Sequence, residues 1–165
     1  MKIKMGALVF LSILATSAWS IDFVATIISQ ESSPLTITSY SAKYQRGSEY
    51  AEEGIRHAIK YKNTSKKKVV AVQFGLVSFD VWNEFIDRTG GVGIEDIASG
   101  SSKKGTWMAR AYSDFSFLTG FAYVSKVRFE DGEIWEADLD DIAEEMQKIE
   151  EDFDVQNLKG KPGNE

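Results

Sequence analysis

The chain contains no cysteine and a single histidine, and these two scarcities narrow its chemistry at once. Without cysteine there is no disulfide, no thiol nucleophile, no thiolate-bound metal and no lipid attached through an N-terminal cysteine. With only His57, a metal site built from several histidines is excluded, and a catalytic Ser-His-Asp triad would have to use this residue. Hydrophobic residues are 43% and charged residues 27% of the 165 positions, which predicts one folded domain.

Long apolar runs are also scarce. The run near the N-terminus, residues 5–15, is shorter than the roughly 20 residues that a membrane span needs. Two lysines precede this run and Ala18-Trp19-Ser20 follows it, which is the pattern of a cleavable secretory signal peptide. We therefore predict a signal peptide at residues 1–20 and a periplasmic or secreted protein, with no membrane span after the signal is removed.

Charge is distributed unevenly along the chain. Residues 21–129 contain 14 Lys or Arg and 11 Asp or Glu, whereas residues 130–165 contain three and fourteen. The exported chain would carry 17 cations and 25 acids, and the linear sequence reveals no continuous basic surface of the kind that binds nucleic acid. We therefore predict a dipolar protein with no nucleic-acid partner.

Most of the chain has the composition of β-strands, with Ile, Val, Thr and Tyr in short runs separated by polar turns. Ile55, His57, Ile59 and Tyr61 alternate with Arg56, Ala58, Lys60 and Lys62, so this strand has one buried face that includes the histidine. A buried structural histidine is favoured, since nothing nearby in the sequence completes a site. The predicted strands cover 22–30, 35–45, 55–61, 69–82, 94–98 and 105–112, with a hairpin over 127–135.

Two glycine-containing segments give more specific predictions. Gly75 lies where the apolar phase of the 69–82 run changes, which predicts a β-bulge that returns Val77 and Phe79 to the core used by the preceding residues. Residues 89–93 lack the spacing of a phosphate-binding or dinucleotide motif and are predicted to form a flexible loop. Three tryptophans are interpreted as core residues: Trp82, Trp107 and Trp135.

Two turns are predicted from their residues. Asp131-Gly132 between two apolar runs predicts a two-residue hairpin loop, in which Phe129 would face Ile134. The run 62–68 contains three consecutive lysines and predicts a solvated turn that protects a sheet edge. Asn63-Thr64-Ser65 also matches a glycosylation acceptor.

The last element is an acidic amphipathic helix over residues 138–158, followed by a tail at 159–165. Asp138 is placed to cap its N-terminus, and the acids that follow are favoured by the helix dipole. The apolar positions recur every three or four residues as one stripe: Leu139, Ile142, Met146, Ile149 and Phe153. We expect this stripe to pack on the sheet or to bind a partner.

Three segments carry a family resemblance: residues 63–69 (Asn-Thr-Ser-Lys-Lys-Lys-Val), 76–80 (Leu-Val-Ser-Phe-Asp) and 97–100 (Ile-Ala-Ser-Gly). Their order resembles small secreted bacterial immunoglobulin-like modules of the FxLYD type, although Ser78, Phe79 and Ser99 depart from that pattern. The resemblance covers about residues 55–130 and implies a β-sandwich without known catalytic residues. We predict a mainly β fold, an antiparallel immunoglobulin-like β-sandwich over 21–137 with a C-terminal amphipathic helix.

These features favour a non-catalytic extracytoplasmic binding or assembly module for an unknown protein or envelope component, with no cofactor. Residues 39–50 mix Tyr, Ser, Gly and Arg in the manner of contact surfaces, since tyrosine offers a large rigid area. The predicted partner-binding residues are Tyr40, Tyr44, Arg46 and Tyr50, together with the helix stripe Leu139, Ile142, Met146, Ile149 and Phe153.

Two alternatives stay open at this point. One is a hydrolase with paired carboxylates, either Asp80 with Glu84 or Glu130 with Glu136. The other is a calcium-binding domain, because oxygen ligands are what Ca²⁺ prefers. The candidate ligands are Glu130, Asp131, Glu133, Glu136, Asp138, Asp140 and Asp141.

Overall fold

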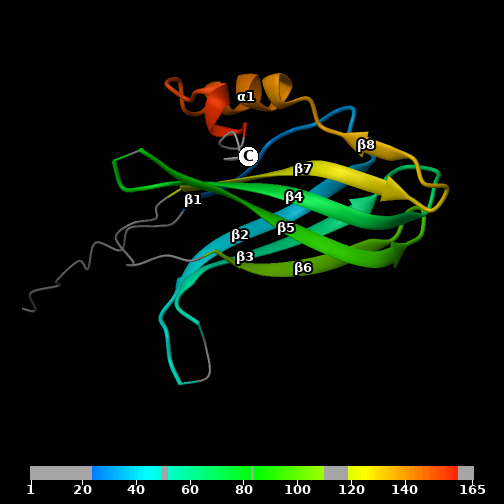
Figure 1. Ribbon diagram of the computed structural model, residues 1–165, viewed down its shortest axis with the longest axis horizontal. Helices are drawn as coiled ribbons and strands as arrows, with labels where there is room; N and C mark the ends of the chain where they lie inside the picture. Colours follow the sequence, from blue (N-terminus) through cyan, green and yellow to red (C-terminus); the bar gives the residue numbers. More distant parts are fainter. Residues whose placement is uncertain (1–23, 50–51, 83, 110–118, 160–165) are drawn as a thin grey trace, which may run out of the picture.

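The computed structural model describes residues 24–49, 52–82, 84–109 and 119–159. These residues form two β-sheets stacked face to face, with one helix on the outer side of the larger sheet (Figure 1). The prediction of a mainly β protein with a C-terminal helix is confirmed. Among the described residues, no helix is long and apolar enough to cross a membrane.

The larger sheet has the strand order β1-β7-β4-β5, with β8 also paired to β7. Its strands are β1 (Val24–Ile27), β4 (Val69–Phe79), β5 (Phe85–Ile97), β7 (Thr119–Phe129) and β8 (Ile134–Glu136). Strand β1 runs parallel to β7, so the prediction of a wholly antiparallel fold is wrong for this pair. The chain can form it because more than ninety residues separate the two strands, which is ample for a crossover.

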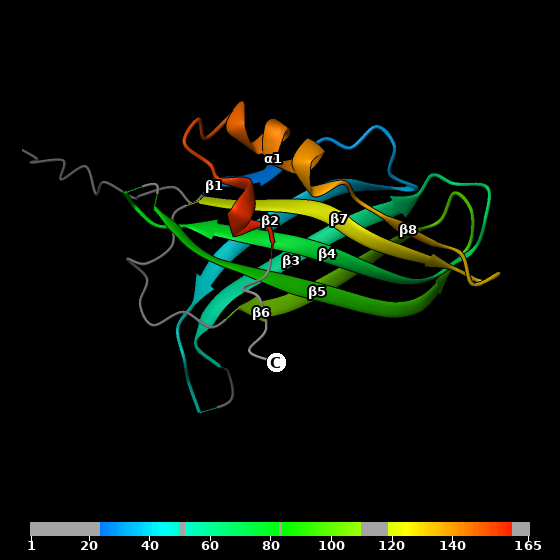
Figure 2. The same cartoon turned by 45° about the horizontal axis from the view of Figure 1, so that its top comes forward.

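The smaller sheet has the order β2-β3-β6, and all its pairs are antiparallel. Its strands are β2 (Leu35–Gln45), β3 (Gly54–Asn63) and β6 (Ser102–Ala109). The predicted alternation in β3 is confirmed: Ile55, His57, Ile59 and Tyr61 are buried, while the residues between them face outward. The end of the β2–β3 hairpin extends beyond the body of the protein (Figures 1 and 2).

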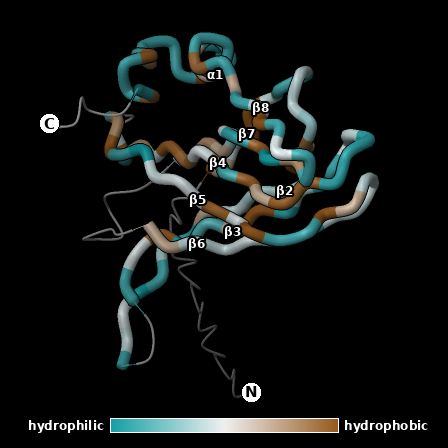
Figure 3. The backbone as a smooth tube through the Cα atoms, turned by 45° about the vertical axis from the view of Figure 1, so that its right-hand side comes forward, coloured by the Kyte–Doolittle hydropathy of each residue, from teal (hydrophilic) through white to brown (hydrophobic). Residues whose placement is uncertain are grey.

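The main hydrophobic core lies between the two sheets. Leu35, Ile37, Ile59 and Tyr61 from the smaller sheet meet apolar residues of β4 and β7. Brown and teal segments alternate along the strands in Figure 3, as expected when one face of each strand is buried.

A second core lies on the opposite face of the larger sheet, under the helix. Val77 and Phe79 of β4 point into this second core with Phe121, whereas Phe74 and Leu76 point into the main core. The predicted bulge at Gly75 is therefore wrong, because the pleat continues through Gly75 and the two apolar sets fill two different cores. A Cβ at position 75 would lie 2.1 Å from Cζ of Tyr123. Only glycine at this position leaves room for that ring.

Helix α1 (Leu139–Gln147) is shorter than the predicted helix over 138–158. Asp138 caps its N-terminus as predicted, with the side chain accepting a hydrogen bond from the Asp140 amide. After Lys148 the chain turns, and a short 3₁₀ helix η2 (Val155–Asn157) follows. The turn brings Phe153 back onto the sheet, where it packs 5.8 Å from the ring of Phe79 between centroids.

Two turn predictions are also corrected. Residues 89–93 lie inside strand β5 and pair with β4, so they are not a loop. In the hairpin, Arg128 pairs with Ile134, so the loop is one residue longer than predicted and Phe129 does not face Ile134. Gly132 has φ of 90°, and its amide donates to the carbonyl of Phe129, which is the geometry of a three-residue hairpin loop closed by a glycine.

Candidate binding surface

The outer face of the smaller sheet gathers basic side chains from three strands. Strand β3 presents Arg56, Ala58, Lys60 and Lys62 outward, because the alternate residues are buried against the core. On one side Lys43 of β2 lies opposite Arg56, and on the other side Lys104 of β6 lies opposite Lys60. We call this surface the basic face. Its members are Lys43, Arg56, Lys60, Lys62 and Lys104, with Thr36, Ser39, Ser41, Ala58, Ser102, Thr106 and Met108 between and around them.

The basic face holds no carboxylate at any of these positions. Its five cationic side chains are exposed, and the residues between them are short: Ser41, Ala58 and Thr106 form one row across the three strands. Neighbouring outward positions are about 6.6 Å apart along a strand and about 4.8 Å apart between strands. The result is a grid of positive charges separated by hydroxyl and methyl groups.

Elsewhere on the described surface, most lysines are neutralised by carboxylates. Lys67 pairs with Asp131 at 2.7 Å and with Glu133, and Lys68 pairs with Glu130 at 3.1 Å. The remaining ion pairs are Lys68–Asp96, Lys103–Glu95, Lys126–Glu136, Lys148–Glu145 and Lys159–Asp140. Within the described ranges, none of the five cations of the basic face takes part in an ion pair. Their charge is therefore available to a ligand.

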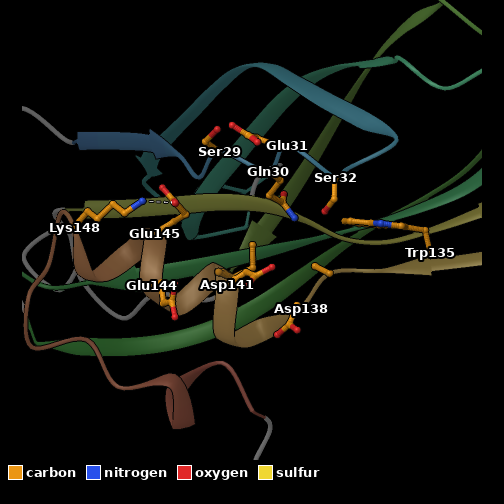
Figure 4. A pocket seen from close by; sticks show the side chains of 12 residues that line it. Ser29, Gln30, Glu31, Ser32, Trp135, Asp138, Asp141, Glu144, Glu145 and Lys148 are labelled. Atoms are coloured by element: carbon orange, nitrogen blue, oxygen red, sulfur yellow. Dashed lines mark hydrogen bonds and ion pairs between the residues drawn. The ribbon is translucent and has the colours of Figure 1, made fainter.

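Acidic side chains collect on the opposite side of the molecule. Helix α1 and the segment 29–32 border a groove of about 520 Å³ (Figure 4). Five of its lining residues are acidic: Glu31, Asp138, Asp141, Glu144 and Glu145. Within the described residues, no group of three or more His, Asp or Glu has the geometry to hold a metal ion.

Two of the predicted contact tyrosines, Tyr40 and Tyr44, are only partly exposed. Tyr40 points inward, where its hydroxyl lies 2.8 Å from Nδ1 of His57, and burial raises the pKa of Tyr40. Tyr44 is half-buried, and its hydroxyl donates to Glu53. Arg46 is exposed near the hairpin end, and Tyr50 lies outside the described residues.

His57 is fully buried on the inner face of β3, as the alternation predicted. Burial lowers the pKa of His57 to about 4, so the side chain is neutral at physiological pH. The hydrogen bond between His57 and Tyr40 joins β3 to β2 in the smaller sheet.

Most side chains of the helix stripe pack against other parts of the protein. Ile142, Met146 and Phe153 are buried in the second core, and Leu139 packs against it. Ile149 is the exception, with 54% of its surface exposed. The stripe therefore packs on the sheet, and four of its five side chains are not free to contact a partner.

Carboxylates of the two candidate catalytic pairs form hydrogen bonds or ion pairs that stabilise the fold. Asp80 accepts hydrogen bonds from the backbone amides of Trp82 and Glu84, so it organises a turn. Glu130 binds Lys68 and Glu136 binds Lys126, at different places on the surface. Neither pair of carboxylates lines the same cavity among those described.

The candidate calcium ligands are likewise dispersed. Asp131 and Glu133 bind Lys67, Asp138 caps α1, and Asp140 lies 3.3 Å from Nζ of Lys159. Lys67 and Lys68 of the 62–68 turn are thus paired with acids of this hairpin rather than simply solvated.

The buried side chain of Asn63 holds the β3–β4 turn together through hydrogen bonds. Its side-chain amide donates to the carbonyls of Lys67 and Ile97, at 2.8 and 2.9 Å, and its Oδ1 accepts from Ser65. Because Asn63 is fully buried with both amide hydrogens engaged, the predicted glycosylation at this residue is incompatible with the folded structure.

The three tryptophans predicted to be core residues differ in exposure. Trp107 and Trp135 are half-buried and pack against the main core, in line with the prediction. Trp82 is 80% exposed at the β4–β5 turn, so the prediction of a core position is wrong there. Strand β4 ends at Phe79, so Trp82 lies beyond the pleat that directs the apolar side chains of β4 into the two cores.

No protein-family model matches the chain, and no curated protein matches its sequence. Among solved structures, a hypothetical protein from Peptoclostridium difficile 630 is 11% identical, with 73% of this chain and 92% of that chain covered and a TM-score of 0.48. A putative ApaA protein from Bordetella pertussis is 13% identical, with 62% of this chain and 85% of that chain covered and a TM-score of 0.40. Similarities this low carry no argument about function.

The basic face was missed from the sequence, although its signal was present. Arg56, Lys60 and Lys62 occupy the alternate positions of a predicted strand, so their common direction could be inferred. Lys43 and Lys104 join them only through the pairing of β2 and β6 with β3. The linear sequence therefore did not reveal this surface.

Proposed function

We propose that this protein is a non-catalytic extracytoplasmic binding module that uses the basic face to bind a polyanionic component of the cell envelope. The observation that carries the proposal is the set of five exposed cations on one sheet face, none of them ion-paired within the described residues. Natural surfaces normally intersperse the two signs of charge, so a single-sign face indicates a ligand of the opposite sign.

The chemistry of the face suits repeated negative groups. Lysine and arginine supply charge-assisted hydrogen bonds to phosphate, sulfate or carboxylate oxygens. Ser39, Ser41 and Thr106 add hydroxyl donors between them. The face has no exposed aromatic ring on which a base could stack, so nucleic acid stays outside the proposal.

A binding role without catalysis is supported by the state of the acidic candidates. Asp80 organises a turn, and Glu130 and Glu136 are each held in an ion pair. The extracytoplasmic location is supported by the signal-peptide pattern at residues 1–20.

The immunoglobulin-like fold also belongs to the proposal. In chain order, β2, β3, β4, β5, β6, β7 and β8 correspond to strands A, B, C, C′, E, F and G of that fold. The pairing orders β2-β3-β6 and β5-β4-β7-β8 then match A-B-E and C′-C-F-G. Such a fold hosts many activities and does not by itself assign one.

The proposal is tested by binding to a soluble polyanion. We would measure the salt concentration at which the protein elutes from immobilised heparin, a chain of sulfate and carboxylate groups. The triple variant Arg56→Gln, Lys60→Gln, Lys62→Gln should elute at clearly lower salt, because each removed contact reduces the salt dependence of binding by about one counterion.

A matched control removes the same charge elsewhere. Lys126→Gln, Arg128→Gln and Lys148→Gln together change two lysines and one arginine outside the basic face. This control should elute like the unaltered protein. Equal losses in both variants would mean that only net charge matters, and the proposal would then be wrong.

A further inference from the structure

We propose that the basic face docks onto the headgroup layer of an anionic phospholipid membrane, so that the protein lies on the bilayer without spanning it. This inference rests on the proposed function and specifies its ligand. The shared chemistry is a dense array of phosphates; the commitment to a bilayer comes from the spread of the cations over three strands and from the placement of charge through the thickness of the molecule.

The cations of the basic face are spread in two dimensions. Arg56, Lys60 and Lys62 lie along β3, while Lys43 and Lys104 lie on the flanking strands. A linear polyanion would contact one row, whereas a bilayer presents headgroups under all three strands at once. The five cations therefore fit a plane better than a chain.

The side chains between the cations are short. Ser41, Ala58 and Thr106 cross the centre of the face with short side chains, and no large residue stands above the cations there. Among the described cavities, only one includes a residue of the face, Thr36, at its margin. A surface without a described pocket suits an extended array of headgroups rather than an enclosed sugar or phosphate group.

The acidic side chains lie on the far side of the molecule. Helix α1 packs on the outer surface of the larger sheet, with Asp140, Asp141 and Glu144 exposed on it, so both sheets separate it from the basic face (Figures 1 and 3). Two stacked sheets and a helix place these carboxylates about 20 Å from the face. Because the Debye length is about 8 Å at physiological ionic strength, they would not repel a bilayer that touches the face.

This arrangement also orients the protein. A negative plane attracts the basic face and repels the helix side, so the electrostatic torque turns β2, β3 and β6 toward the membrane. The alignment does not require a pocket or an inserted apolar residue.

The experiment is sedimentation with lipid vesicles, using the chain from Ile21 onward, which contains all the described structure and lacks the apolar run 5–15. Vesicles of phosphatidylcholine mixed with phosphatidylglycerol are compared with vesicles of phosphatidylcholine alone. We expect binding to the anionic vesicles only, weakening as salt is added. Each cation near an anionic surface strengthens binding about fivefold, so the triple variant Arg56→Gln, Lys60→Gln, Lys62→Gln should bind about a hundredfold more weakly.

A second variant, Thr106→Glu, places one carboxylate in the centre of the face without removing a cation, and it should also weaken vesicle binding. The control variant Lys126→Gln, Arg128→Gln, Lys148→Gln should bind like the unaltered protein. Circular dichroism on all variants checks that they are folded, which is expected since every altered side chain is exposed.

Three results would overturn the inference. Equal binding to both kinds of vesicle would indicate an apolar contact, and equal weakening by the control variant would indicate that the basic face has no special part. Retention on heparin through the basic face without vesicle binding would overturn the membrane as ligand while leaving the proposed function intact. Binding to neither ligand would remove both proposals.

Discussion

The indole Nε1 of Trp107 donates a hydrogen bond to the backbone carbonyl of Val92, 3.1 Å away, and so joins an edge strand of one sheet to an edge strand of the other. The same ring packs against Phe74 of the main core, with 5.4 Å between centroids. Trp107 thus closes the side of the two-sheet core between β5 and β6. It also occupies a carbonyl that an edge strand would otherwise offer to another chain.

Gly91 is predicted to be required for this closure. A Cβ at Gly91 would lie 2.5 Å from Cδ2 of Trp107, so Gly91→Ala should displace the indole and lower the free energy of unfolding by about 1–3 kcal/mol. Gly90→Ala is the matched control, because its Cβ would meet nothing closer than 3.4 Å. Urea denaturation measures both. If the two variants were equally stable, Trp107 would not be packed as described.

Asn63→Ala is predicted to destabilise the protein by about 2–4 kcal/mol, because the carbonyls of Lys67 and Ile97 lose their donor in a buried site. Asn63→Asp should be comparably harmful, since a carboxylate cannot donate to either carbonyl. Lys66→Ala, an exposed change in the same turn, should alter the stability by less than about 0.5 kcal/mol. Thermal and urea melts of the three variants would check the order.

Stability is predicted to fall as the pH is lowered, in part because of His57. The folded-state pKa is about 4, below the ordinary 6.5, so between these values the unfolded chain binds a proton that the folded protein does not. The contribution of neutral His57 is complete above pH 6.5 and is lost as the pH falls toward 4. Between about pH 7 and about pH 4.5 the loss should be roughly 2–3 kcal/mol.

His57→Gln isolates this contribution from that of the carboxylates, which titrate in the same region. The variant should lose less stability than the unaltered protein between the two pH values, when both are measured by urea denaturation. An identical pH dependence in the two proteins would show that His57 titrates normally, against the lowered pKa.

The second core predicts a sharp contrast within the helix stripe. Met146 is fully buried and Ile149 is exposed, although both belong to the same apolar periodicity. Met146→Ala should lower the free energy of unfolding by about 2–5 kcal/mol, and Ile149→Ala by less than about 0.5 kcal/mol. Similar losses would mean that α1 presents a different side to the sheet.

The sequence was sufficient for the elements whose residues alternate or recur regularly. The β3 alternation identified the buried side of His57, and Asp138 identified the start of α1. It failed at Gly75 and at residues 89–93, where glycine was interpreted as a local irregularity of the backbone. Gly75 and Gly91 instead leave room for Tyr123 and Trp107, rings supplied by distant strands that no local pattern reveals.

The basic face, too, depends on contacts between strands that no local sequence pattern reveals. The direction of Lys60 and Lys62 follows from the strand period, but their proximity to Lys43 and Lys104 depends on the pairing of β2 and β6 with β3, in which Lys104 lies opposite Lys60 although 44 residues separate them. Tyr40 illustrates the reverse case. A tyrosine in a polar segment resembles a contact residue, yet the bulge between Ile37 and Ser39 shifts the register and turns the ring toward His57.

Strand β4 has a strand on each edge and an apolar layer on each face, since Phe74 and Leu76 serve one core and Val77 and Phe79 the other. Its amide protons can reach solvent only when both layers open, so they should be the slowest to exchange with deuterium. The two cores therefore form one cooperative unit. Loosening the helix should accelerate exchange in β4 and, through it, in the sheet on the far side.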